Sequence, residues 1–201
     1  MPDPAKHPDL HGNVPDDCPV VLLLVDVLNA LRFEGSDAFL PRALTVARRI
    51  SALRARARRA RVPVIYVNDN AGRWRSDLQQ IVADCTRHDA PGRELSELLV
   101  PGPEDYVVLK PKHSGFYSTT LDTILTYSKA RRLVITGLTT ERCVLFTAND
   151  AFLRDYELFV PSDCTAAIDD ADSAAALRIL ERVLDADTTP SEALDFERLR
   201  R

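Results

Sequence analysis

An unbroken apolar run, Pro19-Val-Val-Leu-Leu-Leu-Val, ends abruptly at a carboxylate, Asp26. Apolar residues at every position, rather than at every second one, indicate a strand that is buried on both faces. Such strands are typical of parallel sheets, which carry helices on both sides. Comparable runs, and therefore further predicted strands, follow at 62–68, 106–110, 132–136 and 156–161.

Helical patterns occupy the segments between these runs. Within 40–60 the apolar side chains recur at intervals of three and four, and similar patterns predict helices after 118–120, at about 141–154 and at about 170–184. The stretch 90–103 holds three prolines and two glycines, which favours a loop. The alternation of strand and helix predicts an α/β fold of three layers, α-β-α, with a mostly parallel, doubly wound, Rossmann-like sheet.

Length and composition indicate a single soluble domain. The 201 residues are 45% hydrophobic and carry a net charge of -4. We expect one domain over 19–201, preceded by an extended, Pro- and Asp-rich arm over 1–18. No run approaches the roughly 18 apolar residues of a membrane span, and the N-terminus lacks the apolar core of a signal peptide. We therefore expect a cytoplasmic location and no membrane partner.

Two further sequence patterns bear on nucleic-acid and metal binding. Seven arginines lie in 48–61, but the same segment carries an apolar stripe that would dock it on the sheet. With a net charge of -4, a solvated basic face is the favoured interpretation, and no nucleic-acid partner is expected. The four cysteines are widely spaced, so neither a zinc site nor a disulfide framework is predicted.

Polar residues end several of the predicted strands. Asp26 ends the first, Asn68 and Asp69 end the second, and Lys110 ends the third. The fourth strand leads into Thr136-Gly-Leu-Thr-Thr-Glu-Arg-Cys143, a turn that enters a helix. Because ligands of parallel sheets bind beyond the carboxyl ends of the strands, these residues are candidates for one site.

Each candidate also has a structural interpretation. Cys143, in the first turn of its predicted helix, is placed for a lowered thiol pKa and for nucleophilic attack, or it is a buried, inert cysteine. Asp26 is a general base, or a cap or salt-bridge partner. Lys110 stabilises the neighbouring charges, or it is an ordinary surface lysine. Spacing alone leaves these alternatives open.

Three segments in order carry a resemblance to a known family. They are Leu22–Asp26 with Asn29, Lys110–Phe116 with Thr120–Asp122, and Thr136–Val144, which continues into Phe146–Ala151 and Pro161–Asp163. In these segments the chain resembles the isochorismatase-like cysteine hydrolases, which include nicotinamidases and N-carbamoylsarcosine amidases. The resemblance covers about residues 19–168.

The resemblance implies a catalytic triad of Asp26, Lys110 and Cys143. Lys112 is the rival lysine, but Lys110 stands at the family distance from the Ser-Gly-Phe element. The resemblance also implies a cis peptide bond between Leu138 and Thr139. The amides of Thr139 and Cys143 would then form the oxyanion hole.

Departures from the family pattern bear on the substrate. Nicotinamidases hold a metal through an Asp-x-His motif and a further histidine, whereas 67–74 contains no histidine. We therefore predict neither a metal nor another cofactor, and assign no role to Asp69 or Asn70. A small apolar pocket walled by Trp74, Phe116 and either Leu31 or Phe33 is expected, with packing in the core or at a subunit interface as the alternative for each.

The sequence therefore predicts a cysteine hydrolase that cleaves a C–N bond of a small amide-like substrate through a thioester. Two alternatives stay open. One is an isochorismatase-type ether hydrolase that acts through Asp26 without covalent catalysis, and the other is a non-enzymatic binding or scaffold protein. The resemblance also implies a homo-oligomer, a dimer or a tetramer.

Overall fold

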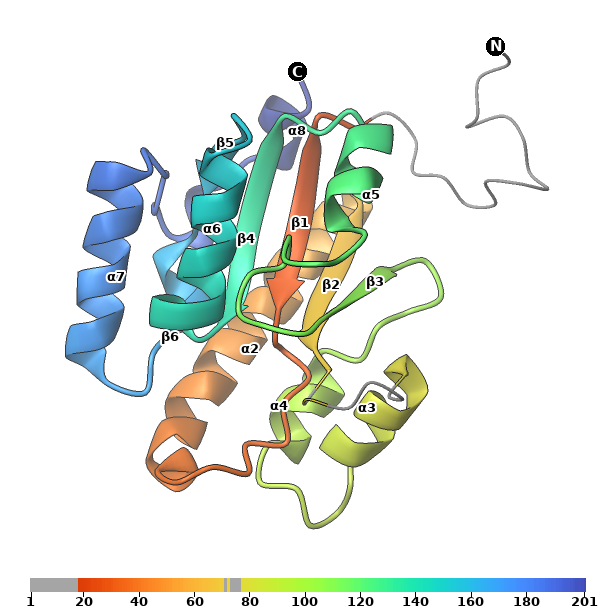
Figure 1. The fold of residues 1–201 in the computed structure, drawn as a ribbon, viewed down its shortest axis with the longest axis vertical. Coiled ribbons are helices and arrows are strands. Elements are labelled where there is room, and N and C mark those ends of the chain that lie inside the picture. Colours follow the sequence, from red (N-terminus) through yellow and green to blue (C-terminus); the bar gives the residue numbers. More distant parts are fainter. Residues whose placement is uncertain (1–17, 71, 73–76) are drawn as a thin grey trace.

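A parallel sheet organises the chain, which is described here by a computed structural model over residues 18–70, 72 and 77–201 (Figure 1). Within these ranges the sheet has the strand order β3-β2-β1-β4-β5, with β6 paired to the end of β4. All of these pairings are parallel, which confirms the predicted doubly wound sheet. The strands are β1 (Val20–Val25), β2 (Val64–Asp69), β3 (Tyr106–Lys110), β4 (Arg132–Leu138), β5 (Glu157–Phe159) and β6 (Thr165–Ala166).

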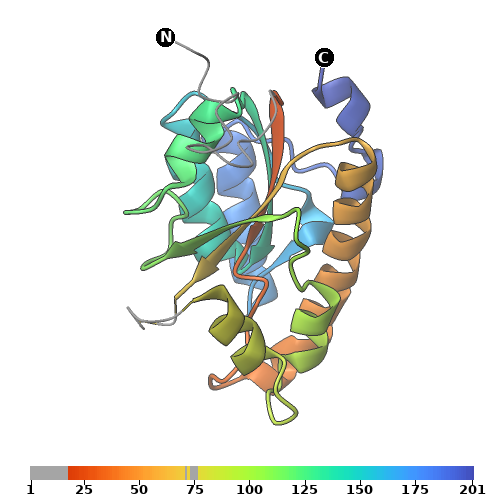
Figure 2. The same ribbon diagram turned by 90° about the vertical axis from the view of Figure 1, so that its right-hand side faces the viewer.

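Helices cover both faces of the sheet, as the three-layer prediction requires (Figures 1 and 2). One face carries α2 (Ser36–Arg59), α4 (Arg93–Leu98) and α8 (Phe196–Leu199). The other carries α5 (Leu121–Tyr127), α6 (Leu145–Phe152) and α7 (Asp170–Val183). The remaining elements are α3 (Leu78–Cys85), the π-helical turn η2 (Thr140–Val144), and the 3₁₀ turns η3 (Ser162–Cys164) and η4 (Ser191–Ala193).

The central position of β1 explains its unbroken apolar sequence. Leu22 and Leu24 pack into the core beneath α2, while Leu23 and Val25 pack into the core beneath α5 and α6. All four side chains are completely buried. Burial of each contributes about 2 kcal/mol, so both faces of this strand hold the layers together.

Two predicted segments differ from the structure. The expected loop at 90–103 contains α4, because Leu95 and Leu99 bury their side chains against the α2 layer despite the flanking prolines and glycines. The helix expected at about 141–154 is not regular at its start: η2 precedes α6. Propensity alone does not specify either feature, since both depend on packing against distant elements.

The sequence predicted that the arginines of α2 form a solvated face, but some of them bind other segments of the chain. Arg54 donates to the carbonyl oxygens of Leu98 and Val100 at 3.1 Å, and Arg58 pairs with Asp105 at 2.5 Å. These contacts fasten the segment between α4 and β3 to α2. In the described ranges, no helix is both long enough and apolar enough to cross a membrane.

We predict that Gly137→Ala destabilises the fold by about 4 kcal/mol or more. Gly137 has φ of 124°, and a Cβ there would lie 1.9 Å from the carbonyl oxygen of Val25 in the neighbouring strand. Urea denaturation followed by circular dichroism measures the loss. Gly35→Ala is the matched control, because φ is 82° there but the added Cβ meets no atom within 4 Å. It should cost only about 1–2 kcal/mol, and equal losses for the two variants would refute the packing argument.

Candidate active site

The carboxylate of Asp26 lies at the carboxyl end of the central strand. The chain turns there through a left-handed conformation, with φ of 51°, which Asp tolerates better than most residues. The Asp26 amide donates to the carbonyl of Val67 at 3.0 Å, which keeps the turn against β2. One carboxylate oxygen in turn accepts the amide of Asp69 at 2.6 Å. Two strands thus fix the position and orientation of this carboxylate.

The ammonium of Lys110 lies at the centre of the site and has no exposed side-chain surface. It is 2.8 Å from Asp26 Oδ2, 3.7 Å from Asp69 Oδ2 and 3.5 Å from Cys143 Sγ. Burial by itself would lower the pKa of Lys110, but the charge of Asp26 and the neighbouring sulfur outweigh it, so this pKa is raised. Burial also raises the pKa of Asp26, against the opposing effect of Lys110. Lys110 therefore holds its proton.

Cys143 reaches the same point from the other side of the central strand. The Lys110 ammonium donates to its sulfur at 3.5 Å, and the Asp26 carboxylate is near enough to raise the pKa of the thiol. The peptide bond between Leu138 and Thr139 is cis. The Thr139 carbonyl accepts hydrogen bonds from the amides of Arg142 and Val144, each at 3.2 Å. In the sequence, the amide of Cys143 therefore lies between two amides that are hydrogen-bonded to this carbonyl.

Buried hydroxyl groups hold the turn that carries the cysteine. Thr140 Oγ1 lies 2.9 Å from Thr165 Oγ1 on β6 and 3.3 Å from Ser173 Oγ on α7. The Thr139 hydroxyl donates to Glu141 Oε1 at 2.8 Å. Because both threonine hydroxyls are buried, losing that of Thr140 would remove the bond to the buried Thr165 hydroxyl. The turn is thereby attached to both the sheet and the outer helix.

The thiol is not activated in the resting site, contrary to the expectation drawn from its place near a helix start. The pKa of Cys143 is raised to about 12, chiefly by burial. The nearby charge of Asp26 also raises this pKa, and its effect is larger than the opposite effect of Lys110. The irregular first turn and the buried carboxylate therefore outweigh any effect of the helix dipole. The free thiolate is therefore a very small fraction of Cys143 at neutral pH.

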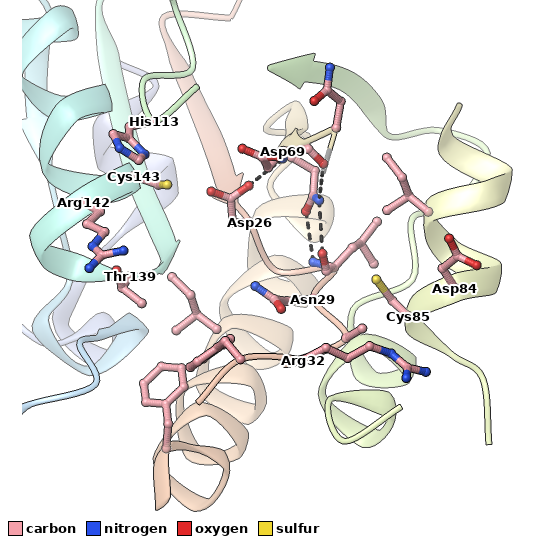
Figure 3. A pocket seen from close by; sticks show the side chains of 18 of the residues that line it. Asp26, Asn29, Arg32, Asp69, Asp84, Cys85, His113, Thr139, Arg142 and Cys143 are labelled. Carbon is pink, nitrogen blue, oxygen red and sulfur yellow. Dashed lines mark hydrogen bonds between the residues drawn. The ribbon is translucent and has the colours of Figure 1, made fainter. Parts of the chain in front are cut away.

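A cavity of about 680 Å³ opens beside these groups (Figure 3). Its wall includes both ends of the predicted oxyanion segment and several residues not singled out from the sequence. Among the latter, Arg32 follows β1, and Asp84 and Cys85 lie on α3. The residues nearest the chemistry are Asp26, Asp69, His113, Leu138, Thr139 and Cys143.

Of the residues predicted for the apolar wall of the pocket, Phe33 lines the cavity and two others do not. Leu31 and Phe116 are buried in the two hydrophobic cores and are not part of the cavity wall. Phe116 instead packs beneath the guanidinium of Arg154, 4.6 Å from its ring centre. Trp74 lies outside the described residues. The apolar part of the cavity wall comes mainly from Leu28, Phe33, Phe39, Ile81 and Leu138.

Asn68, which the sequence placed among the candidates at the strand ends, is a positioning residue. Its side chain accepts the amide of Leu28 at 3.0 Å and donates to the carbonyl of the same residue at 3.1 Å. This pair of bonds joins the end of β2 to the segment that leaves β1. A polar residue at the end of an otherwise apolar strand was the signal, but a partner 40 positions away could not be identified from it.

The part of the chain that the structure describes offers no obvious set of metal ligands. Among those residues, no group of three or more His, Cys, Asp or Glu side chains could hold an ion. His113 packs instead against the ring of Phe146, with 5.5 Å between the ring centres.

The fold has three layers around a parallel sheet. At the carboxyl ends of its strands, the ammonium of Lys110 contacts both an acid and a thiol. Together these two features define the class of protein. The family model described as Isochorismatase domain matches residues 20–190. The chain therefore belongs to the isochorismatase family of hydrolases, and the resemblance found in its sequence is confirmed.

Individual relatives agree with this assignment. The chain is 38% identical, over 86% of its length and 94% of the relative's, to the uncharacterized isochorismatase family protein YaaI of Bacillus subtilis (strain 168). It is similar to the crystal structure of N-carbamoylsarcosine amidase from Thermoplasma acidophilum, with 28% identity, a TM-score of 0.67, and coverage of 88% of this chain and 98% of that one. The nicotinamidase of Staphylococcus aureus shares the fold at 17% identity, with a TM-score of 0.62 and coverage of 86% and 98%.

We predict that iodoacetamide labels Cys143 slowly at neutral pH and about tenfold faster with each added pH unit, until the pH approaches its pKa of about 12. Asp26→Asn should increase the labelling rate at pH 8 by about tenfold, because iodoacetamide reacts with the free thiolate and the substitution removes a negative charge that raises the thiol pKa. Mass spectrometry of the labelled peptide gives the rates.

Glu94→Gln is the control for this comparison, since it removes an equal charge from the exposed pair with Arg48. Its labelling rate should match that of the unmodified protein. Equal or slower labelling of Asp26→Asn would contradict the assigned cause of the raised pKa.

Proposed function

We propose that this protein is a cysteine hydrolase that cleaves the C–N bond of a small amide-like substrate through a thioester on Cys143. The observation that carries the proposal is the position of the Lys110 ammonium, 2.8 Å from Asp26 and 3.5 Å from the sulfur of Cys143, beside a cavity. An acid, a cation and a nucleophile in mutual contact are what covalent hydrolysis requires.

In the first half of the reaction, Asp26 takes the thiol proton as the sulfur attacks the carbonyl carbon. Direct contact matters here, because a thiol with a pKa of about 12 forms almost no free thiolate at neutral pH. The carbonyl oxygen gains a negative charge, which the amides of Thr139 and Cys143 receive. Asp26 then returns the proton to the nitrogen, the C–N bond breaks, and an acyl thioester remains.

In the second half, water replaces the departed amine. Asp26 takes a proton from the water as its oxygen attacks the thioester carbonyl, and the same amides receive the second oxyanion. The C–S bond then breaks, the sulfur recovers a proton from Asp26, and a carboxylic acid is released. Burial raises the pKa of Asp26, which suits a carboxylate that must both accept and return protons.

Lys110 serves both halves as a fixed positive charge. Its ammonium offsets the negative charge that passes between Asp26 and the sulfur, and its complete burial prevents water from screening that effect. The similarity to N-carbamoylsarcosine amidase supports an amide-type substrate. We also propose a homo-oligomer with no cofactor and no nucleic-acid or membrane partner.

We predict that Cys143→Ala lowers turnover at least about thousandfold, because the alanine lacks the sulfur that forms the acyl intermediate. The assay is a panel of primary amides, carbamoyl compounds and lactams, with ammonia or amine release as the readout. Brief acid quenching and intact mass spectrometry of the unmodified protein should reveal the acyl adduct on Cys143.

Cys164→Ala is the matched control, because this cysteine is completely buried in the core, away from the cavity. It should keep the turnover rate while losing some stability. If Cys143→Ala retains the rate of the unmodified protein, covalent catalysis is excluded and ether hydrolysis through Asp26 becomes the better explanation. If no compound is cleaved by either protein, a binding role is favoured.

A further inference from the structure

The loop that follows Lys110, residues 111–120, has no role in the steps proposed above. Lys110 is the last residue of β3, which is the edge strand of the described sheet. From there the loop crosses the end of the sheet toward α6 before α5 begins (Figure 1). A lysine at the end of an edge strand is ordinarily exposed, yet the side chain of Lys110 has no exposed surface. Groups outside the sheet must therefore cover it.

The loop packs directly on the face of the sheet to which Lys110 points. Lys110 shares this face with Val108, two residues earlier, which packs in the core beneath α5 and α6. Gly115 of the loop lies against Val67 of β2 on the same face, since a Cβ added to Gly115 would be 2.7 Å from Val67 Cγ1. The Lys110 ammonium reaches Asp26 past β2, so its side chain lies on the face that the loop covers.

Hydrogen bonds from two neighbouring residues attach this loop to α6. The Ser114 hydroxyl donates to Asp150 Oδ2. The Gly115 amide donates to Thr147 Oγ1 at 3.0 Å. The side chains of Ser114 and Thr147 are buried, so water does not compete for these bonds. Because α6 continues directly from η2, the turn that carries Cys143, the two bonds join the loop to the helix of the cysteine.

We propose that the hydrogen bond between Ser114 and Asp150 keeps the loop closed over Lys110, and that Asp150 is thereby a positioning residue for the ammonium. The closed loop excludes water, so the charge of Lys110 acts unscreened on Asp26 at 2.8 Å and on the sulfur of Cys143 at 3.5 Å. Asp150 is not part of the cavity wall, so it acts through Ser114 and not on a substrate. The effect on catalysis rests on the proposed function of Cys143, whereas the closure of the loop does not.

Acetylation with acetic anhydride tests the closure directly, because Lys112 is exposed in the same loop and provides an internal reference. The readout is the ratio of the acetylation rates of Lys110 and Lys112 at pH 8, measured by fragment-ion mass spectrometry. This ratio should rise at least about tenfold in Ser114→Ala and in Asp150→Ala, since either substitution frees the loop to open. Asp150→Asn keeps a neutral acceptor for the hydroxyl, so its ratio should rise less.

The double variant Ser114→Ala/Asp150→Ala should match the larger of the two single effects, because both substitutions remove the same bond. Asp122→Asn is the matched control. It removes a carboxylate that pairs with Arg154 at 3.1 Å, also on α6 side of the loop, but leaves the bond between Ser114 and Asp150 in place. Its ratio should equal that of the unmodified protein.

Labelling of Cys164 by iodoacetamide distinguishes opening of the loop from general unfolding. Cys164 is completely buried in the core on the opposite face of the sheet, so its labelling should stay as slow in every variant as in the unmodified protein. An unchanged acetylation ratio in Ser114→Ala and Asp150→Ala overturns the proposal. An equal rise in Asp122→Asn, or a rise accompanied by faster labelling of Cys164, overturns it as well.

Turnover separates the positioning role from the function on which it rests. For a compound cleaved in the panel, Asp150→Ala should lower kcat about tenfold and change KM by less than about twofold, because the loss concerns charges that act during the reaction. An opened loop with an unchanged kcat overturns the positioning role of Asp150. Full turnover by Cys143→Ala would instead overturn the covalent mechanism and leave the acetylation results standing.

Discussion

The contact between the buried ammonium of Lys110 and the carboxylate of Asp26 is the interaction on which the site depends. Neither charge could be buried alone, because an isolated ion in the interior costs several kcal/mol. Paired at 2.8 Å, they form a fixed dipole, and the ammonium of this pair lies 3.5 Å from the sulfur of Cys143. The backbone amide of Asp69 completes the arrangement by holding the remaining oxygen of Asp26.

The parallel sheet makes that contact possible. β1 lies at its centre between β2 and β4, and β3 lies beyond β2, so the chain brings the ends of separate strands to one edge. Lys110 ends β3, two strands away from the central one, and its side chain reaches across to Asp26. The cysteine arrives from the opposite side through η2, which hydroxyl contacts to β6 and α7 hold in place. The cavity at this edge therefore lies beside groups of opposite charge that are within a few ångströms of one another.

Several of these features could be predicted from local sequence. The apolar runs predicted all the main strands, because a strand buried on both faces leaves no freedom for polar residues. A carboxylate, a lysine and a strand–turn–helix cysteine at the ends of such runs indicated the site. Local sequence could not indicate that Leu31 and Phe116 pack into the cores, that α4 forms between prolines, or that Asn68 bonds to Leu28, since each depends on a distant partner.

The sequence by itself determined the layered architecture and the set of chemical groups at the sheet edge, because hydrophobic periodicity and strand ends are local properties. Only the tertiary structure decided the protonation of those groups. The thiol of Cys143 was expected to be acidic from its place in a helix, but burial beside a carboxylate raises its pKa to about 12. Solvation and charge at a site are set by everything that surrounds it in space, and no window of sequence contains that information.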